Sequence, residues 1–81
     1  MLFRERFEQA LAALPLSNLQ VRVEDGDFNK YLGFVVSPDF EGMEEGDRQV
    51  LVWNHLRNSF TLDEMGQIEF FFTDTPSEVA P

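Results

Sequence analysis

The stretch Leu19-Gln-Val-Arg-Val-Glu-Asp-Gly-Asp-Phe-Asn-Lys-Tyr-Leu-Gly-Phe-Val-Val36 decides the fold of this chain. Its first part, 19–23, alternates strictly between apolar and polar residues, which is typical of a strand with one buried face. Its last part, 31–36, is almost wholly apolar and predicts a second strand. Asp25 and Gly26 lie between the two and form a pair that is common in tight turns. We therefore predict an antiparallel β-hairpin.

Two amphipathic helices are predicted on either side of this hairpin. Residues 2–14 place apolar side chains at three- and four-residue spacing, which is one face of a helix. Pro15 ends this helix, because proline lacks an amide donor and disfavours helical geometry in the residue before it. The second helix is predicted to start at Met43 or Glu44 and to end near Asn58.

A third strand completes the predicted sheet at Ile68–Thr73. Just before it, Thr61 and Glu64 have the spacing of a capping box, which predicts one helical turn. The element order is therefore α-β-β-α-β. Because a helix joins the second and third strands, we expect these two to run parallel. The sequence predicts an α+β fold, a three-stranded mixed sheet with both helices on one face.

One domain accounts for this chain of 81 residues. A chain of this length can form a single modest core, and no internal repeat or linker divides it. We place the domain at residues 1–74. Residues 75–81 are polar and carry proline, so we predict a flexible C-terminal tail.

The sheet has one face that two helices do not cover. If Leu32 and Phe34 point toward the helices, the strand alternation leaves Tyr31 and Val35 on the open face. In the last strand the same reasoning buries the residues on either side of Phe71 and exposes Phe71 itself. We predict that this apolar patch binds a partner, through the residues Tyr31, Val35, Phe71 and Glu69. Exposed aromatic residues also occur on proteins without any binding role, and this alternative stays open.

The charge balance restricts the class of partner. The chain has 15 acidic and 6 basic residues and a net charge of −9. Nucleic acids and anionic membranes both need clustered basic residues, so we predict neither as a partner. No apolar run approaches the roughly 18 residues of a membrane span. The acidity either keeps the protein soluble or serves docking onto a basic surface.

The residues for catalysis or for a metal site are not assembled in this sequence. There is no cysteine, which removes thiolate nucleophiles and, in so small a domain, favours the cytoplasm. The single histidine, His55, lies within a predicted helix without a nucleophile beside it. Asp25, Asp27 and Asn29 have the spacing that opens a calcium loop, but the glycine and the final glutamate of such loops are missing. We predict that the protein is not an enzyme and has no catalytic, cofactor-binding or metal-binding residues.

The middle of the chain resembles the BolA family. The stretch Phe34-Val-Val-Ser-Pro-Asp-Phe-Glu-Gly-Met43 is similar to the strand and turn of that family, written VVS-x-x-F-x-G-K/M. Arg48-Gln-Val-Leu-Val-Trp53 is similar to its R-x-x-L-V helix. The last strand, 67–76, lies where the family has I-H-A-L followed by T-P.

This resemblance implies a fold related to class II KH domains and a partner of the glutaredoxin type. It also implies a [2Fe–2S] cluster shared with that partner, with a histidine ligand directly after the isoleucine of the last strand. This chain carries Glu69 at that position, so we predict no cofactor. We expect a small adaptor or regulatory protein that acts by protein–protein binding. The alternative is an acidic chaperone that covers a basic surface of an enzyme or nucleic-acid-binding protein. A homodimer also stays open.

Overall fold

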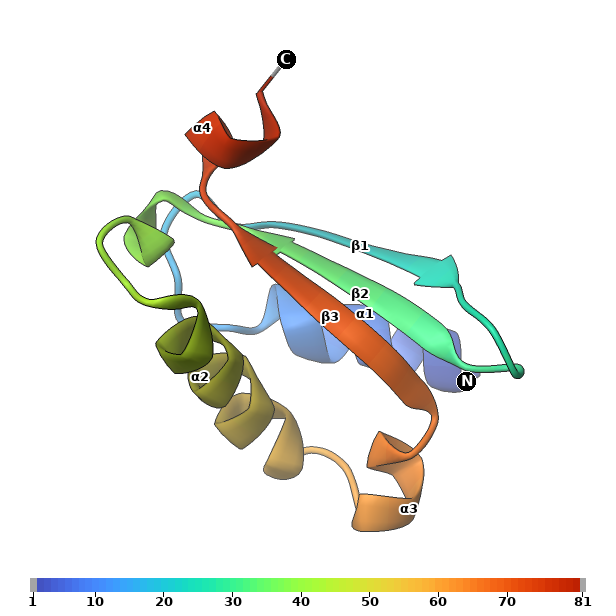
Figure 1. The fold of residues 1–81 in the computed structure, drawn as a ribbon. Coiled ribbons are helices and arrows are strands. Elements are labelled where there is room, and N and C mark those ends of the chain that lie inside the picture. Colours follow the sequence, from blue (N-terminus) through green and yellow to red (C-terminus); the bar gives the residue numbers. More distant parts are fainter. Residues whose placement is uncertain (1, 81) are drawn as a thin grey trace.

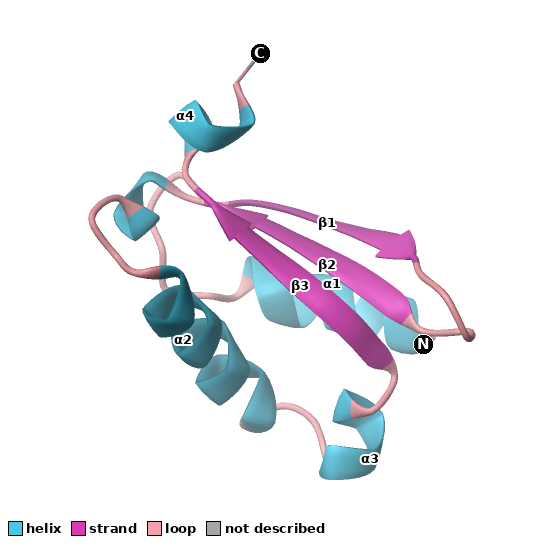
Figure 2. Ribbon diagram, in the orientation of Figure 1, coloured by secondary structure: helices cyan, strands magenta, loops and turns pink. Residues whose placement is uncertain are grey.

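The structure is a computed structural model that describes residues 2–80. The chain forms two longer helices, a three-stranded sheet and short helical turns, which Figure 2 distinguishes by colour. In chain order the elements are α1 Phe3–Ala12, β1 Gln20–Asp25, β2 Tyr31–Val36, a 3₁₀ turn Pro38–Phe40, α2 Glu45–Arg57, α3 Leu62–Met65, β3 Ile68–Asp74 and α4 Pro76–Val79. The predicted α+β class and the predicted order of the main elements are confirmed.

The sheet has the strand order β1-β2-β3, so β2 is the central strand. β1 pairs with β2 antiparallel and β2 pairs with β3 parallel, as the element order predicts. The register of β2 and β3 changes once. Tyr31 lies opposite Ile68, whereas Leu32 lies opposite Phe70, so Glu69 is an extra residue of the β-bulge type in β3.

Both helices pack on the same face of the sheet (Figure 1). α1 contacts β1 and β2, α2 contacts β3, and the two helices contact each other. Their apolar sides and the inward side chains of the sheet form the core, with Phe7, Leu11, Leu14, Val23, Val35, Phe40, Val52, Leu56, Phe60, Met65 and Phe71 buried.

Gly33 permits the close approach of α1 to the central strand. A Cβ atom at this position would lie only 2.8 Å from Cζ of Phe7 and 3.1 Å from Cδ1 of Leu11. Gly33 is buried, and the helix therefore lies directly on the backbone of β2. This contact fixes which face of β2 is the inner one, because residues 31, 33 and 35 share a face of the strand.

The centre of the hairpin turn lies three residues later than the predicted Asp25-Gly26 pair. Lys30 N donates to Asp27 O at 3.0 Å, so Phe28 and Asn29 are the central residues of the turn. Both have positive φ, at 58° and 59°, as the turns that suit the twist of a hairpin require. The aspartate and glycine belong instead to the end of β1 and the residue after it.

The predicted tail, 75–81, differs from a simple flexible extension. Residues 76–79 form α4, which Thr75 caps at the N-terminus and which Figure 1 places at the end of β3. The Thr75 side chain accepts from the Glu78 amide, and the Glu78 side chain accepts from the Thr75 amide. This reciprocal capping box fixes the turn. Residue 81 lies outside the described residues.

Candidate functional site: the open face of the sheet

The uncovered face of the sheet carries five large apolar side chains from the two neighbouring strands β2 and β3. Phe70 is 46% exposed and Phe72 is 40% exposed, and the three side chains from β2 are partly buried. Phe72 stacks on Phe34 with ring centroids 5.0 Å apart and meets Phe70 edge-on at 4.9 Å. We call this surface the aromatic face, and its members are Leu32, Phe34, Val36, Phe70 and Phe72.

Three of the predicted partner-binding residues do not lie on this face. Val35 is fully buried and Phe71 is 5% exposed, so their predicted exposure is wrong. Tyr31 is half-buried on the helix side, where its ring lies 5.9 Å from that of Phe3. The physical reasons are the contact of α1 with Gly33, which turns residues 31, 33 and 35 inward, and the bulge in β3. After this bulge, Phe71 points inward and its two neighbours point outward.

Glu69, the fourth predicted residue, lies exposed at the rim of the aromatic face. It is the extra residue of β3, and its Oε1 accepts a hydrogen bond of 2.9 Å from the amide of Asp27 in the hairpin. The carboxylate therefore connects the start of β3 to the β1–β2 turn. It lies so close over Gly26 that a Cβ atom there would collide with it.

Asp25, Asp27 and Glu69 border a hollow of about 490 Å³ at the hairpin end of the aromatic face. Its apolar part is formed by Leu32, Phe70 and Phe72. Asp25 is paired with Arg4 at 2.8 Å. Among residues 2–80, no basic side chain forms an ion pair with the other two carboxylates. The hollow therefore combines aromatic surface with uncompensated negative charge.

At the β1 side of the same face, a cation already lies on an aromatic ring. The guanidinium carbon of Arg22 lies 4.1 Å from the centroid of the Phe34 ring, which is a cation–π contact. Nε of the same guanidinium donates to a carboxylate oxygen of Glu24. Thus one arginine and one carboxylate of β1 cover the β1 side of the aromatic face.

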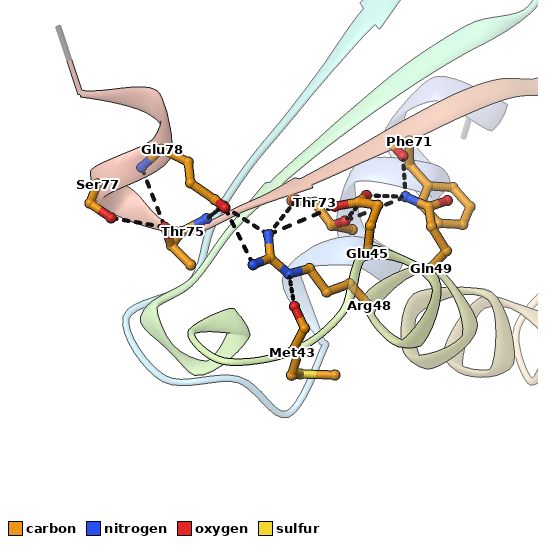
Figure 3. A network of polar contacts seen from close by, with 9 residues as sticks. All are labelled: Met43, Glu45, Arg48, Gln49, Phe71, Thr73, Thr75, Ser77 and Glu78. Atoms are coloured by element: carbon orange, nitrogen blue, oxygen red, sulfur yellow. Dashed lines mark hydrogen bonds and ion pairs between the residues drawn. The ribbon is translucent and has the colours of Figure 1, made fainter.

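The free edge of β3 is covered by side chains of α2 (Figure 3). Nε2 of Gln49 donates to the carbonyl of Phe71 at 2.9 Å, and Nη1 of Arg48 donates to the carbonyl of Thr73 at 3.1 Å. Unpaired strand edges bind other strands through such groups. Because these two carbonyls are already satisfied, the edge of β3 is a poorer docking site than the aromatic face.

Arg48 also holds the C-terminal turn α4 in place (Figure 3). Its side chain is buried and forms an ion pair of 2.7 Å with Glu78. The hydrogen bond from Arg48 and that from the Thr75 amide lower the pKa of Glu78 from 4.5 to about 2. Burial and the nearby carboxylates of Glu78 and Glu45 raise the pKa of Asp74. These hydrogen bonds and ion pairs hold α2, β3 and α4 together.

The described residues bring together no set of metal ligands. No group of three or more histidine, cysteine, aspartate or glutamate residues within 2–80 could hold a metal ion. His55 lies on α2, where its Nε2 is 2.7 Å from the carbonyl oxygen of Ala10 and joins the two helices. Within the same part of the chain, no helix is long and apolar enough to cross a membrane.

Comparison with known proteins identifies the family. No family model matches the sequence, and no curated protein matches it. Among solved structures, a BolA protein homologue from Coxiella burnetii is 30% identical, with 96% of each chain covered and a TM-score of 0.67. The chain belongs to the BolA family. BolA1 from Arabidopsis thaliana is 28% identical over 100% of this chain and 99% of that one, with a TM-score of 0.67. A Bol-like protein from Babesia bovis is 30% identical over 96% and 90%, with a TM-score of 0.60.

The donor groups of this BolA protein do not fit the [2Fe–2S] cluster that the family resemblance implies. Such clusters are held by thiolates and imidazoles. The position of the expected histidine ligand is Glu69, and one of its oxygens is bound to the Asp27 amide. The only histidine is on α2, bonded to α1, and the chain contains no cysteine.

The aromatic face itself could have been found from the sequence, but its members could not. Both faces of β2 carry apolar side chains and both faces of β3 carry phenylalanine, so the pattern indicates an uncovered apolar surface without showing which residues form it. Strict alternation predicts that Phe70 and Phe72 face the helices, because the bulge at Glu69 has no signal in the hydrophobic pattern. The one available signal was Gly33, since an isolated glycine in a strand often marks a close backbone approach.

Proposed function

We propose that this BolA protein is a non-enzymatic adaptor that binds another protein through its aromatic face. The observation that carries the proposal is the uncovered pair Phe70 and Phe72, which stands beside three further apolar side chains of β2. A contiguous apolar surface rimmed by charged residues is typical of a protein-binding site. Membership of the BolA family supports a regulatory or adaptor role.

The proposed partner is a protein that binds without sharing a [2Fe–2S] cluster with this chain. A glutaredoxin-type partner agrees with the family. It would dock by apolar contact, because Glu69 occupies the position of the cluster-binding histidine that the family resemblance implies. The absence of cysteine supports action in the cytoplasm. The net charge of −9 supports a protein partner over a nucleic acid.

Replacing the two exposed aromatics tests the proposal. The variant Phe70→Ser/Phe72→Ser removes both rings from the aromatic face. Each change should lower the free energy of unfolding by only about 1–2 kcal/mol, because the rings are already about half exposed. Affinity capture from the source cell, followed by mass spectrometry, should recover partners with the wild type that the double variant loses. The fluorescence of Trp53, the single tryptophan, confirms that the variant is folded.

Leu62 provides the matched control, because it is a large apolar residue on α3 that is 77% exposed. Leu62→Ser should retain the same partners as the wild type. If the folded double variant captures those partners as well as the control does, the aromatic face is not the binding surface.

A further inference from the structure

The β1 side of the aromatic face indicates which chemical group a partner could place on this surface. There, the guanidinium of Arg22 lies on Phe34 and is held by Glu24. A planar cation, an aromatic ring beneath it and a carboxylate beside it form one unit. Both charged side chains stay exposed, at 60% for Arg22 and 49% for Glu24, so the ring and the carboxylate together hold a guanidinium at the protein surface.

The hairpin end of the same face also has exposed rings and carboxylates, and of its three carboxylates only Asp25 is paired with a cation, Arg4. Phe70 and Phe72 provide the exposed rings, and Glu69 and Asp27 provide the carboxylates around the hollow of about 490 Å³. Among residues 2–80, neither carboxylate has a basic partner. The bond from the Asp27 amide holds Glu69 Oε1 in position, whereas Oε2 has no hydrogen bond to any described residue.

We propose that this end of the aromatic face binds an arginine-containing segment of the partner protein. The arginine guanidinium would lie over Phe70 or Phe72 and donate to Glu69 and Asp27. Arginine suits this site better than lysine, because its flat guanidinium stacks on a ring and binds carboxylates in a planar fork. The inference rests on the proposed function, since it names the chemistry of the protein that docks there.

The charge of the whole chain favours the same partner. A net charge of −9 attracts a basic surface and repels a second copy of this chain. A second copy also offers few cations, because four of its six basic residues are paired with its own carboxylates and only Lys30 and Arg57 have no ion pair among residues 2–80. A basic partner segment therefore fits this end of the face, and a symmetric dimer fits it less well.

A pair of peptides tests the proposal directly. The probe is the capped hexapeptide glycine-arginine-leucine-arginine-glycine-serine, and its control has citrulline in place of both arginines. In a nuclear magnetic resonance titration of the full chain, we expect the arginine peptide to shift the amide signals of β2 and of residues 69–72. The citrulline peptide should bind about three- to tenfold more weakly, since it keeps the shape but loses the charge. Equal binding of the two peptides would overturn the proposal.

Two isosteric variants locate the cation. Glu69→Gln/Asp27→Asn removes both charges, and the glutamine carbonyl can still accept from the amide of residue 27. This variant should bind the arginine peptide about three- to tenfold more weakly than the wild type. Glu5→Gln/Glu8→Gln makes the same change in net charge on α1, behind the sheet, and should change binding little at 0.1 M salt. Equal losses in both variants would show only a general charge effect and would overturn the site.

The same variants separate this inference from the proposed function. If Phe70→Ser/Phe72→Ser loses the captured partners and Glu69→Gln/Asp27→Asn keeps them, the arginine site is wrong and the adaptor surface stands. If both variants keep all partners, the proposed function itself fails.

Discussion

Single residues carry much of the local geometry of this protein, and Phe28 is the clearest case. It is 88% exposed at the hairpin turn, and it and Asn29 both have positive φ. Bulky residues disfavour this region because the side chain crowds the backbone, whereas asparagine followed by glycine suits it. The turn therefore holds an aromatic residue in a strained conformation without burying it.

Replacing the two turn residues should stabilise the protein. We expect Phe28→Asn/Asn29→Gly to raise the free energy of unfolding by about 1 kcal/mol, because it removes backbone strain and almost no packing. Urea unfolding followed by Trp53 fluorescence measures the change. Leu62→Asn, which removes another exposed apolar side chain, should leave the stability nearly unchanged. A loss of stability in the turn variant would contradict the strain argument.

The residue scale also shows where prediction from sequence reached its limit. The capping box of Thr61 and Glu64 was predicted and is confirmed, because its two partners are three residues apart and the signal is local. The bulge at Glu69 was not predicted, because it depends on how β3 meets β2 between residues such as Tyr31 and Ile68, which are 37 positions apart in the sequence. One extra residue reverses the side chains that follow it, and this reversal moved Phe71 from the predicted site into the core.

At the scale of elements, the order of helices and strands and the buried face of α1 were predictable, whereas the inner faces of β2 and β3 were not. Periodicity identified α1, α2 and the three strands within a few residues of their bounds. The position of the hairpin turn sets the register of β1 on β2, and an odd shift exchanges the two faces of a strand. Because the turn lies at Phe28 rather than at Asp25-Gly26, Val23 pairs with Gly33, and both face the helices.

The tie between α2 and α4 makes part of the stability dependent on pH. Glu78 has an ordinary pKa of 4.5 in the unfolded chain and a pKa of about 2 in the folded protein. Its contribution is therefore fully present above pH 4.5 and is lost as the pH falls from 4.5 toward 2. Asp74 opposes this trend, because its raised pKa means that acid favours its folded, protonated form.

Glu78→Gln tests the tie. The variant should be less stable than the wild type at pH 7, because Arg48 keeps a buried guanidinium with one carboxylate fewer. The difference in the free energy of unfolding should shrink as the pH is lowered from 6 to about 3. Glu41→Gln, at an exposed acid without an ion pair among the described residues, should differ little from the wild type throughout. A difference for Glu78→Gln that does not change with pH would exclude the charge interaction as its cause.

At the scale of the whole molecule, salt should affect the two kinds of association in opposite directions. Every copy carries a net charge of −9, so two copies repel each other at low ionic strength. Salt screens this repulsion, with a Debye length of about 10 Å at 0.1 M and about 3 Å at 1 M. A basic partner is attracted by the same charge, and screening weakens that complex.

We therefore expect self-association to increase with salt and binding of the arginine peptide to decrease with it. Sedimentation velocity at 0.05 M and 0.5 M sodium chloride should show mostly monomer at the lower concentration of salt. Any dimer at the higher concentration should be reduced in Phe70→Ser/Phe72→Ser and unchanged in Leu62→Ser. A stable dimer at low salt that Phe70→Ser/Phe72→Ser abolishes would mean that a second copy occupies the aromatic face.

The central position of β2 has a consequence for the synthesis of the chain. β1 and α1 precede or adjoin β2 in the sequence, but its other neighbour, β3, is the last strand to be made. While the ribosome is still producing α2 and α3, the nascent hairpin exposes one unpaired edge of an apolar strand. Only when residues 68–74 emerge can that edge close, and only with Glu78 can Arg48 complete its contacts. The nascent protein is therefore most open to wrong pairing, or to capture by a chaperone, in the interval just before β3 is finished.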